Sequence, residues 1–570
     1  MVVHLKRNGG EFLMAIYTVT DTDLASIADA IREKGGTSAP LSFPAGFTDA
    51  IDAIPTGGGG SVERKAVTFI DYDGTILYSY TATEAQALTE LPENPSHTGL
   101  TAQGWNWTLA QIKSRLTDTG GDVLVGQEYT TSSGASEIDI KLDDSEFLEP
   151  CLVAAVNGSA TVDWGDGTST DTMTGTSHTT LLYKRHTYAA TGQYTIRITV
   201  NSGSFIFRTN TGSSYASVLQ VYNYPRSRVY ANRIIRVRIG ASCAIANGAF
   251  NECKCLESVI IPGSAYGVDT YAFQNCYSLK SVTIPSMVTN IGNGAFQGCV
   301  SLRDFSFPYE VSSLGTAIFN HCKSLQRITV PYGVTGIESS MFGYCRSLQS
   351  VILHDSVTSI GDYAFIGCET LMEIEIPDGV TSIGGSAFYE CACLKDITIP
   401  DEVETIGANA FTKCFSIHEI TVPDDVTTIG SYAFNRCESL TEVVLPTSIT
   451  GIPNNAFEQC YDLREINIPE GVTGIGGSAF SNCYSIKSIT IPSTVTGIEA
   501  YAFSNCYGML EYHFLPTTPP TLYASNVFSN IPSGAYIYVP YSADHSILNA
   551  YKAASNWSAY ANVIREETQP

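Results

Sequence analysis

The sequence predicts a multidomain, mainly β chain whose C-terminal half is a stacked solenoid. The first observation is a period of 23 residues that runs without an insertion from Phe250 to Phe503. Twelve phenylalanines recur at this period, and a cysteine stands three residues after each of them. A fixed period of this length is typical of solenoids built from stacked repeats. The second observation is the length of 570 residues, which exceeds the size of one core and predicts further domains.

A single repeat shows the local structure that we expect. The apolar side chains between residues 365 and 371 are three positions apart, which predicts a short helical or 3₁₀ turn. Ile374 and Ile376 are two positions apart, which predicts a strand with one buried face. Pro377 lacks a backbone N–H and is expected to end this strand. Residues 380–383 are expected to form a second extended side, and neighbouring coils must share their walls to be stable.

The repeat follows the pattern Val-Thr-x-Ile-Gly-x-x-Ala-Phe-x-x-Cys-x-x-Leu-x-x-Ile-x-Ile-Pro, which is clearest at residues 380–400 and 426–446. This pattern resembles the BspA-like leucine-rich repeat. The resemblance implies a solenoid over residues 243–515, preceded by a cap or transition at 204–242 and followed by a C-terminal cap at 516–570. For function it implies recognition or adhesion at a surface, because members of the family present the solenoid to varied ligands.

The charge balance limits the classes of partner. The formal net charge is −25, whereas nucleic acids and anionic membrane surfaces both require basic patches, so we expect no nucleic-acid partner. No apolar run approaches the length of a membrane-spanning helix, so no membrane insertion is expected. The apolar run at residues 12–17 is too short to be the apolar core of a secretory signal. Two starts stay open, Met1 and Met14, and residues 1–13 precede the protein only if Met14 is the start.

The N-terminal region, residues 1–56, is expected to be a helical attachment module. An apolar stripe between Leu24 and Ile31 predicts an amphipathic helix. Residues 24–47 resemble N-terminal segments of tail-fibre-like proteins in phages of Gram-positive gut bacteria. This resemblance implies attachment to a phage tail or baseplate. Residues 57–61, Gly-Gly-Gly-Gly-Ser, are typical of a flexible linker.

Residues 62–132 are expected to form a small β-rich spacer. The Asp-Gly pair at 73–74 is a strong hairpin signal, and the module resembles small β-grasp-like spacers of phage and surface proteins. The segment around Asp71 also resembles the nucleophile motif of haloacid-dehalogenase phosphatases. Such an enzyme needs a larger doubly wound domain with a downstream lysine and an acidic metal pair, so the spacer interpretation is favoured. Trp105 and Trp107 are favoured as core residues over a sugar platform.

Residues 137–203 resemble a PKD domain, an immunoglobulin-like β-sandwich that is typically a spacer or a binding accessory. The resemblance rests on residues 162–168 and 186–198. Asp163 and Asp166 could help to hold a calcium ion, but a hydrogen-bonded turn is the favoured interpretation.

An arginine cluster follows in this otherwise acidic chain. Two explanations stay open: the cluster packs against an acidic partner subunit, or it solvates the open first coil of the solenoid, which needs a cap. The arginines are Arg208, Arg226, Arg228, Arg233, Arg236 and Arg238.

Twelve of the sixteen cysteines belong to the repeat. Each is expected to be a small buried side chain that faces the same cysteine one coil away. Stacked disulfides are disfavoured, because they would distort neighbouring coils. The Cys-x-Cys pairs at 253–255 and 391–393 are weak zinc candidates, since no second pair stands near them. Assembly in a reducing cytoplasm fits this pattern.

Successive predicted strands carry an outward-facing residue at the same position, and this column of residues is acidic. Its carboxylates would stand about 5 Å apart, where like charges destabilise one another. One explanation is a solvated acidic face that is partly neutralised by Lys395, His418, Arg464 and Lys487. The other is a recognition surface for a cationic or cation-bridged glycan or protein receptor, since solenoids usually bind on extended surfaces. The candidate ligand-binding residues are Glu373, Asp396, Glu419, Glu442 and Glu465.

Together these features predict a non-enzymatic phage virion protein of the tail-fibre or receptor-binding type. It would be made in the host cytoplasm and placed on a tail or another external appendage. The N-terminal region would contact tail or baseplate proteins, and the solenoid would bind a glycan or protein on the host surface, in a homo-oligomer such as a trimer. The alternatives are a bacterial BspA-like surface adhesin and a structural head or tail decoration. No catalytic residue, metal site or cofactor is predicted.

Overall fold

The computed structural model describes most of the chain from residue 65 onward, namely residues 65–119, 123–208, 217–221 and 229–568, and the backbone of two N-terminal strands. The chain divides into two compact units, Met1–Arg64 and Lys65–Pro570. In the first unit, β1 (Val2–Lys6) pairs antiparallel with β2 (Phe12–Ile16). The predicted N-terminal helix and the predicted glycine linker lie outside the described residues.

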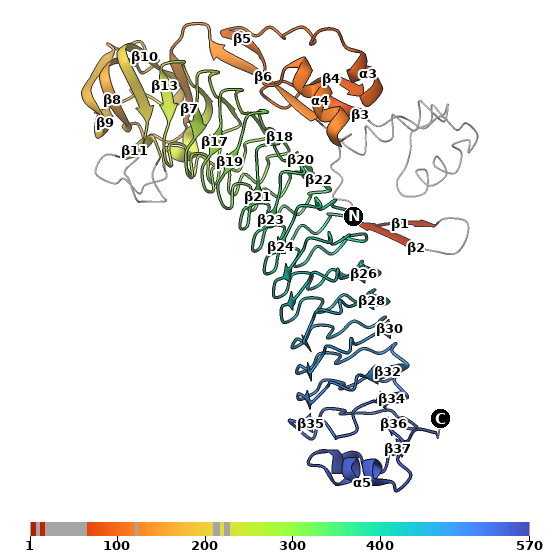
Figure 1. Ribbon diagram of the computed structural model, residues 1–570. Coiled ribbons are helices and arrows are strands. Elements are labelled where there is room, and N and C mark those ends of the chain that lie inside the picture. The colour runs from red at the N-terminus through yellow and green to blue at the C-terminus, as the bar shows by residue number, and fades with distance from the viewer. Residues whose placement is uncertain are drawn as a thin grey trace. The chain divides into compact units, whose positions relative to one another are not determined.

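Most of the second unit is a solenoid of stacked coils (Figure 1). Each coil adds to two rows of short parallel strands, and the pairing follows the sequence period. In the first row Glu419 pairs with Glu442, and in the second row Thr405 pairs with Thr428. The predicted fold class, a mainly β chain with a leucine-rich-repeat solenoid, is confirmed.

The two rows have the following members. Along the coils the first row contains β14 (Ser258–Ile260), β16 (Ser281–Thr283), β18 (Asp304–Ser306), β20 (Arg327–Thr329), β22 (Ser350–Ile352), β26 (Glu419–Thr421), β28 (Glu442–Val444), β30 (Glu465–Ile466), β32 (Ser488–Ile491) and β34 (Glu511–Phe514). The second row contains β15 (Gly267–Val268), β17 (Asn290–Ile291), β19 (Ser313–Leu314), β21 (Gly336–Ile337), β23 (Ser359–Ile360), β24 (Ser382–Ile383), β25 (Thr405–Ile406), β27 (Thr428–Ile429), β29 (Gly451–Ile452), β31 (Gly474–Ile475), β33 (Gly497–Ile498) and β35 (Thr521–Leu522).

The third side of each coil consists of hydrogen-bonded turns, in line with the short helical or 3₁₀ turn expected at residues 365–371: the Cys368 N–H donates to the Phe365 carbonyl, and the Leu371 N–H donates to the Cys368 carbonyl, both at 3.1 Å. Before and within these turns, Tyr363 and Gly367 adopt left-handed backbone conformations, with φ of 59° and 66°. This alternation directs backbone N–H groups toward the next coil, so that Phe365 N–H donates to the Ala387 carbonyl at 2.8 Å. Hydrogen bonds within each turn and hydrogen bonds between coils therefore both hold this side.

The repeated phenylalanines form a continuous buried stack. From coil to coil their ring centroids are 5.3 to 6.2 Å apart. Phe528 extends the stack beyond the predicted repeats, 5.5 Å from Phe503. The C-terminal cap therefore continues the solenoid and then closes it. Its elements are β36 (Tyr536–Val539), α5 (Ser546–Ala553), η2 (Trp557–Tyr560) and β37 (Ile564–Glu566).

A β-rich segment precedes the first coil. Its strands join β14 in one eight-stranded sheet that contains the path β11-β8-β10-β7-β12-β14. Because β12 pairs with both β7 and β14, this sheet runs directly into the solenoid. The expected PKD-like sandwich of two separate sheets is therefore not confirmed. The elements are β7 (Ser136–Leu142), β8 (Pro150–Asp163), β9 (Asp171–Arg185), β10 (Gly192–Phe207), β11 (Leu219–Val221), η1 (Ala231–Arg233), β12 (Ile234–Arg238) and β13 (Cys243–Ile245).

Three arginines of the predicted cluster form ion pairs with acidic side chains that lie on β7 or directly after it. Arg236 and Arg238 lie 3.1 and 3.2 Å from the Asp139 carboxylate on β7. Arg233 lies 3.2 Å from the Asp143 carboxylate. Since β12 covers the first coil, these contacts favour the cap explanation over an acidic partner subunit for these three residues.

Residues 65–131 form the small module (Figure 1). Its four-stranded sheet has the order β4-β3-β6-β5. The first and last strands of the module, β3 and β6, are parallel neighbours in the middle, which agrees with the β-grasp-like topology expected here. β3 and β4 form the hairpin predicted at 73–74. The elements are β3 (Lys65–Ile70), β4 (Ile76–Thr81), α3 (Ala82–Ala87), β5 (Leu100–Trp105), α4 (Leu109–Thr119) and β6 (Val123–Thr131).

Candidate functional site

The outer column of the first strand row carries all five candidate carboxylates. Glu373 pairs with Asp396, and Glu442 pairs with both Glu419 and Glu465. All five side chains are exposed, whereas most residues that directly follow them are buried. We call these five residues the strand face. At the spacing of paired strands, their backbones stand about 4.8 Å apart.

The strand face carries uncompensated negative charge. Within the described residues, none of its carboxylates forms an ion pair, and Lys395, His418, Arg464 and Lys487 do not reach them. Repulsion along the column is therefore not offset by local ion pairs. This arrangement agrees with a surface that meets a cationic partner, and that role stays a prediction.

The small module covers the same side of the first coils. β6 packs against β14, β16 and β18. Asn106 Nδ2 donates to the Ile284 carbonyl at 3.1 Å and to Ser306 Oγ at 2.8 Å. Ser281 Oγ donates to the Tyr72 carbonyl at 3.0 Å. Ser281 occupies the column in which the later coils carry carboxylates, so the open strand face begins only beyond the module.

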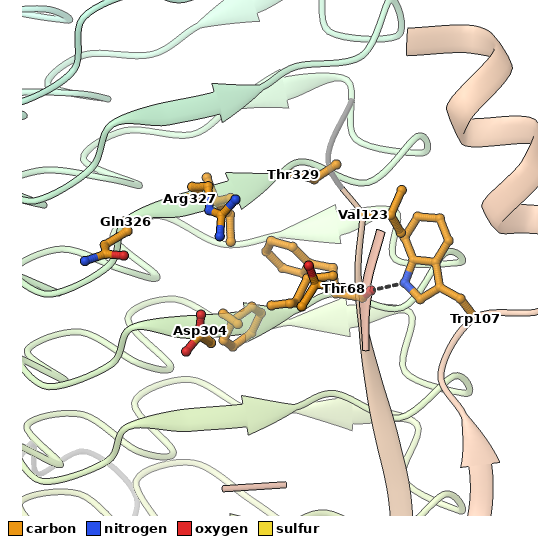
Figure 2. Close-up of a pocket in the computed structure, with 11 residues that line it drawn as sticks. Thr68, Trp107, Val123, Asp304, Gln326, Arg327 and Thr329 are labelled. Atoms are coloured by element: carbon orange, nitrogen blue, oxygen red, sulfur yellow. Dashed lines mark hydrogen bonds between the residues drawn. The ribbon is translucent and has the colours of Figure 1, made fainter. Parts of the chain in front are cut away.

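Trp107 and Gly126 of the small module lie directly against the solenoid. Trp107 is buried, and its Nε1 donates to the Phe307 carbonyl at 2.6 Å (Figure 2). Its ring lies edge-on to Tyr309, with centroids 5.5 Å apart. A Cβ on Gly126 would stand 2.5 Å from Thr283 Oγ1, so glycine is needed for this contact. The prediction that Trp107 is a core residue is confirmed, but no sequence signal identified the solenoid as its partner.

A cavity of about 50 Å³ remains between the module and the coils. Figure 2 shows Thr68 and Trp107 from the module and Asp304 and Arg327 from the solenoid around it. Burial raises the pKa of the Asp304 carboxyl, and the positive charges of Arg303 and Arg327 oppose this shift. The cavity has room for a few water molecules but not for an organic ligand of ordinary size.

The buried polar cluster of the module has a structural explanation. Asp71 is 4% exposed, and its carboxylate accepts a hydrogen bond from the Tyr129 hydroxyl at 2.8 Å and contacts His97 Nε2 at 2.6 Å. These contacts fix the loop that carries His97 to the hairpin. The mixed four-stranded sheet also differs from the doubly wound domain that the phosphatase resemblance requires. Trp105 packs against Phe69, which confirms its core assignment.

The other candidate sites of the sequence form turns or stay apart. Asp163 Oδ1 accepts the Gly165 N–H at 2.9 Å, and Asp166 Oδ1 accepts the Thr168 N–H at 3.1 Å, as the turn interpretation predicts. Among the residues that the structure describes, no group of three or more His, Cys, Asp or Glu side chains is placed to hold a metal ion. The same residues contain no helix with the length and apolar character needed to cross a membrane.

The repeat cysteines are free and buried, as predicted, but they also donate hydrogen bonds. Cys391 Sγ lies 3.2 Å from the Phe365 carbonyl of the preceding coil. The same contact recurs from Cys276 to Cys506. The Phe365 carbonyl also accepts the Cys368 N–H at 3.1 Å. From Cys276 onward, each repeat thiol therefore links two coils, a role that the sequence did not reveal.

Comparison with protein families identifies the solenoid. A family model described as "BspA type Leucine rich repeat region (6 copies)" matches residues 243–372, 359–484 and 450–556. Together these matches cover more than half of the 570 residues. They do not extend to the segments that resemble a PKD domain or a tail fibre. No curated protein matches the chain.

Two solved structures are similar to this chain, and the first shares its fold. A leucine-rich repeat protein from Bacteroides ovatus is 24% identical with a TM-score of 0.53, and the match covers 67% of this chain and 89% of that chain. A leucine rich cell surface protein from Faecalibacterium prausnitzii is 32% identical with a TM-score of 0.38, and the match covers 55% of this chain and 90% of that chain. With the family match over its solenoid, the chain belongs to the BspA-type leucine-rich repeat family.

Proposed function

We propose that this protein is a non-enzymatic adhesin that binds a basic or cation-bridged partner through the strand face. The observation that carries this proposal is the row of exposed carboxylates, none of which forms an ion pair within the described residues. The corresponding side of the first coils is already occupied by the small module. A solenoid of this family offers its extended outer surface for binding, and here the accessible part of that surface is acidic.

The charges of the strand face define the expected mode of binding. Two unit charges at this spacing repel each other by about 1 kcal/mol in water. A lysine, an arginine or a bridging cation between neighbouring carboxylates would remove this repulsion. Exposed charges of this kind mainly increase the association rate, and salt weakens their effect. Binding should therefore be fast at low ionic strength and should slow as salt is added.

A charge-matched pair of variants tests the proposal with the full chain. The first variant carries Glu419→Gln and Glu442→Gln on the strand face. The control carries Glu404→Gln and Glu499→Gln, two exposed glutamates on other sides of the coils, and has the same net charge. Association with immobilised poly-lysine, basic extracellular proteins and bacterial cell-wall preparations is measured. The first variant should associate several-fold more slowly than the control. Equal behaviour of both variants, or no binding by the natural chain, would contradict the proposal.

A phage tail-fibre role is a second candidate, because residues 24–47 resemble the N-terminal segments of such proteins. These residues lie outside the described part of the chain, so this candidate depends on the sequence resemblance alone. It places the protein on a virion, as a homo-oligomer such as a trimer, whereas the adhesin proposal places it on a bacterial surface. Quantifying the protein in purified phage particles and in the bacterial surface fraction discriminates the two locations.

A further inference from the structure

We propose a second binding site, for a short neutral or amino oligosaccharide, in a polar groove on the second strand row. The groove has a volume of about 420 Å³; it begins just after β15 and crosses β17 and β19. It lies on a different side of the coils from the strand face, so this inference goes beyond the adhesin proposal. The polar side chains that line it are Asp269, Asn290, Asn293, Ser313, Thr316 and Glu338.

The groove offers fixed hydrogen-bonding groups. Asn293 Oδ1 accepts the Thr316 N–H at 2.9 Å, which orients the amide. The Nδ2 group of Asn293 makes no hydrogen bond within the described residues and can donate to a ligand. Asn290 Nδ2 donates to Ser313 Oγ at 3.2 Å, which leaves the Asn290 carbonyl oxygen as an acceptor. Oriented amides next to hydroxyls match the alternating donors and acceptors of sugar hydroxyls.

Carboxylates stand at the two ends of the groove. Asp269 belongs to the coil of β15, and Glu338 directly follows β21, three coils further along. Their backbones are therefore about 14 Å apart along the stack. The Glu338 carboxylate forms no ion pair or hydrogen bond in the described part of the chain. Between these ends, Gly315 lines the groove next to Asn293. A Cβ on Gly315 would stand 2.4 Å from Asn293 Oδ1. This shape suits an elongated ligand with hydroxyl or amino groups.

An exposed aromatic side chain stands three residues before Asp269 in the same coil. Tyr266 is 72% exposed, the largest value for a large apolar side chain among the described residues. It directly precedes β15, and its carbonyl accepts the Thr289 N–H at 3.3 Å, next to Asn290. An amphipathic aromatic ring beside polar groups can pack against the apolar face of a sugar ring while its hydroxyl stays in water. This ring favours a saccharide over an extended basic peptide as the occupant.

The test uses the full chain and a printed panel of defined oligosaccharides, including chitotetraose, its deacetylated form, cellotetraose and maltotetraose. The two groove variants are Asn293→Ala and Tyr266→Ala. Asn454→Ala is the matched control for the first, because Asn454 Oδ1 accepts the Gly477 N–H at 2.6 Å in the same way outside the groove. Tyr523→Ala is the control for the second, since Tyr523 is 69% exposed near the other end of the solenoid.

We expect the natural chain and both controls to retain at least one oligosaccharide, and each groove variant to bind it about tenfold more weakly, the effect of losing one good contact. Absence of binding to the whole panel, or an equal loss in a control and its partner variant, would overturn the inference. The strand-face variant with Glu419→Gln and Glu442→Gln should keep its oligosaccharide affinity. This separates a failure of the groove from a failure of the adhesin proposal.

Discussion

Cys391 shows how one residue type acquires two roles from its position. The sequence predicts a small buried side chain, and the structure adds a hydrogen bond from its thiol to the Phe365 carbonyl. Burial also raises the pKa of the Cys437 thiol in this column to about 12. The thiolate is the reactive form of cysteine. Restricted access and suppressed ionisation therefore both protect the buried cysteines from reagents. Cys255 and Cys393 are the two exposed cysteines.

Thiol labelling tests this difference. In the native protein at pH 8, we expect an alkylating reagent to modify Cys255 and Cys393 rapidly and the buried cysteines slowly. After denaturation, all sixteen cysteines should react. Mass spectrometry of the digested protein identifies the labelled positions. Rapid native labelling of Cys391 or its equivalents would show that the coils open or that the column is not buried.

Glu128 is a second residue whose position sets its chemistry. Burial raises the pKa of its carboxyl above the ordinary value of 4.5, and a hydrogen bond from the Ser286 N–H at 2.6 Å opposes this shift. Below pH 4.5 the carboxyl is protonated in the folded and the unfolded chain alike. As the pH rises through the raised pKa, the folded chain must bury a charge that the unfolded chain keeps in water. The contribution of Glu128 to stability is thus lost toward neutral pH.

The variant Glu128→Gln keeps an acceptor for the Ser286 N–H but removes the charge. We expect it to have a higher thermal midpoint than the natural chain at pH 7 and a similar midpoint at pH 4. Thermal unfolding followed by circular dichroism at the two pH values provides the measurement. A variant that is less stable at pH 7 and unchanged at pH 4 would mean that the ionised carboxylate stabilises this contact.

At the scale of elements, the docking of the small module depends on close backbone approach. Gly126 on β6 and Thr283 on β16 come so near that a methyl group at 126 would collide with the threonine side chain. Such overpacking typically costs 1–3 kcal/mol, so we expect Gly126→Ala to lower the free energy of unfolding by about 2 kcal/mol. Adding Thr283→Ala should restore part of this loss. Urea unfolding of both single variants and the double variant measures the coupling.

A purely additive double variant would show that the two residues do not touch. In that case the module would not dock through β6. The Asn106→Ala variant gives an independent check, because Asn106 Nδ2 contacts both Ile284 and Ser306 across the same contact. Asn106→Ala should also lower the free energy of unfolding, although it leaves Gly126 and Thr283 unchanged.

The turn side of the coils shows which part of an element the sequence does not predict. Three-residue spacing at 365–371 predicts a short helical or 3₁₀ turn, and the structure has turns with such i+3 to i hydrogen bonds, but the spacing does not predict the left-handed residues that accompany them. The left-handed conformation at Tyr363 gives no signal in the sequence, since tyrosine rarely adopts it. Its stabilisation comes from hydrogen bonds to the next coil, such as that from the Tyr363 N–H to the Gly385 carbonyl. Only the stacked arrangement supplies that partner.

At the scale of the whole molecule, charge repulsion accumulates along the strand face. The chain carries a net charge of −25, and the five carboxylates are close enough for salt to screen their repulsion. We expect the thermal midpoint to rise with sodium chloride at pH 7. Glu442→Gln should raise the midpoint at low salt and reduce the salt dependence, whereas Glu499→Gln should change both less. Equal effects of the two variants would assign the salt dependence to net charge alone.

The sequence by itself determined the repeat, the inward phenylalanine and cysteine columns, and the outward position of Glu442 and its neighbours. It could do so because a fixed period with two-residue alternation leaves one stable way to bury the apolar side chains. Only the tertiary structure decided that Trp107 and Gly126 cover the first coils and that Asn290 and Asn293 line one groove. Those contacts join residues that no local pattern connects, so they exist only once the coils have stacked and the module has docked.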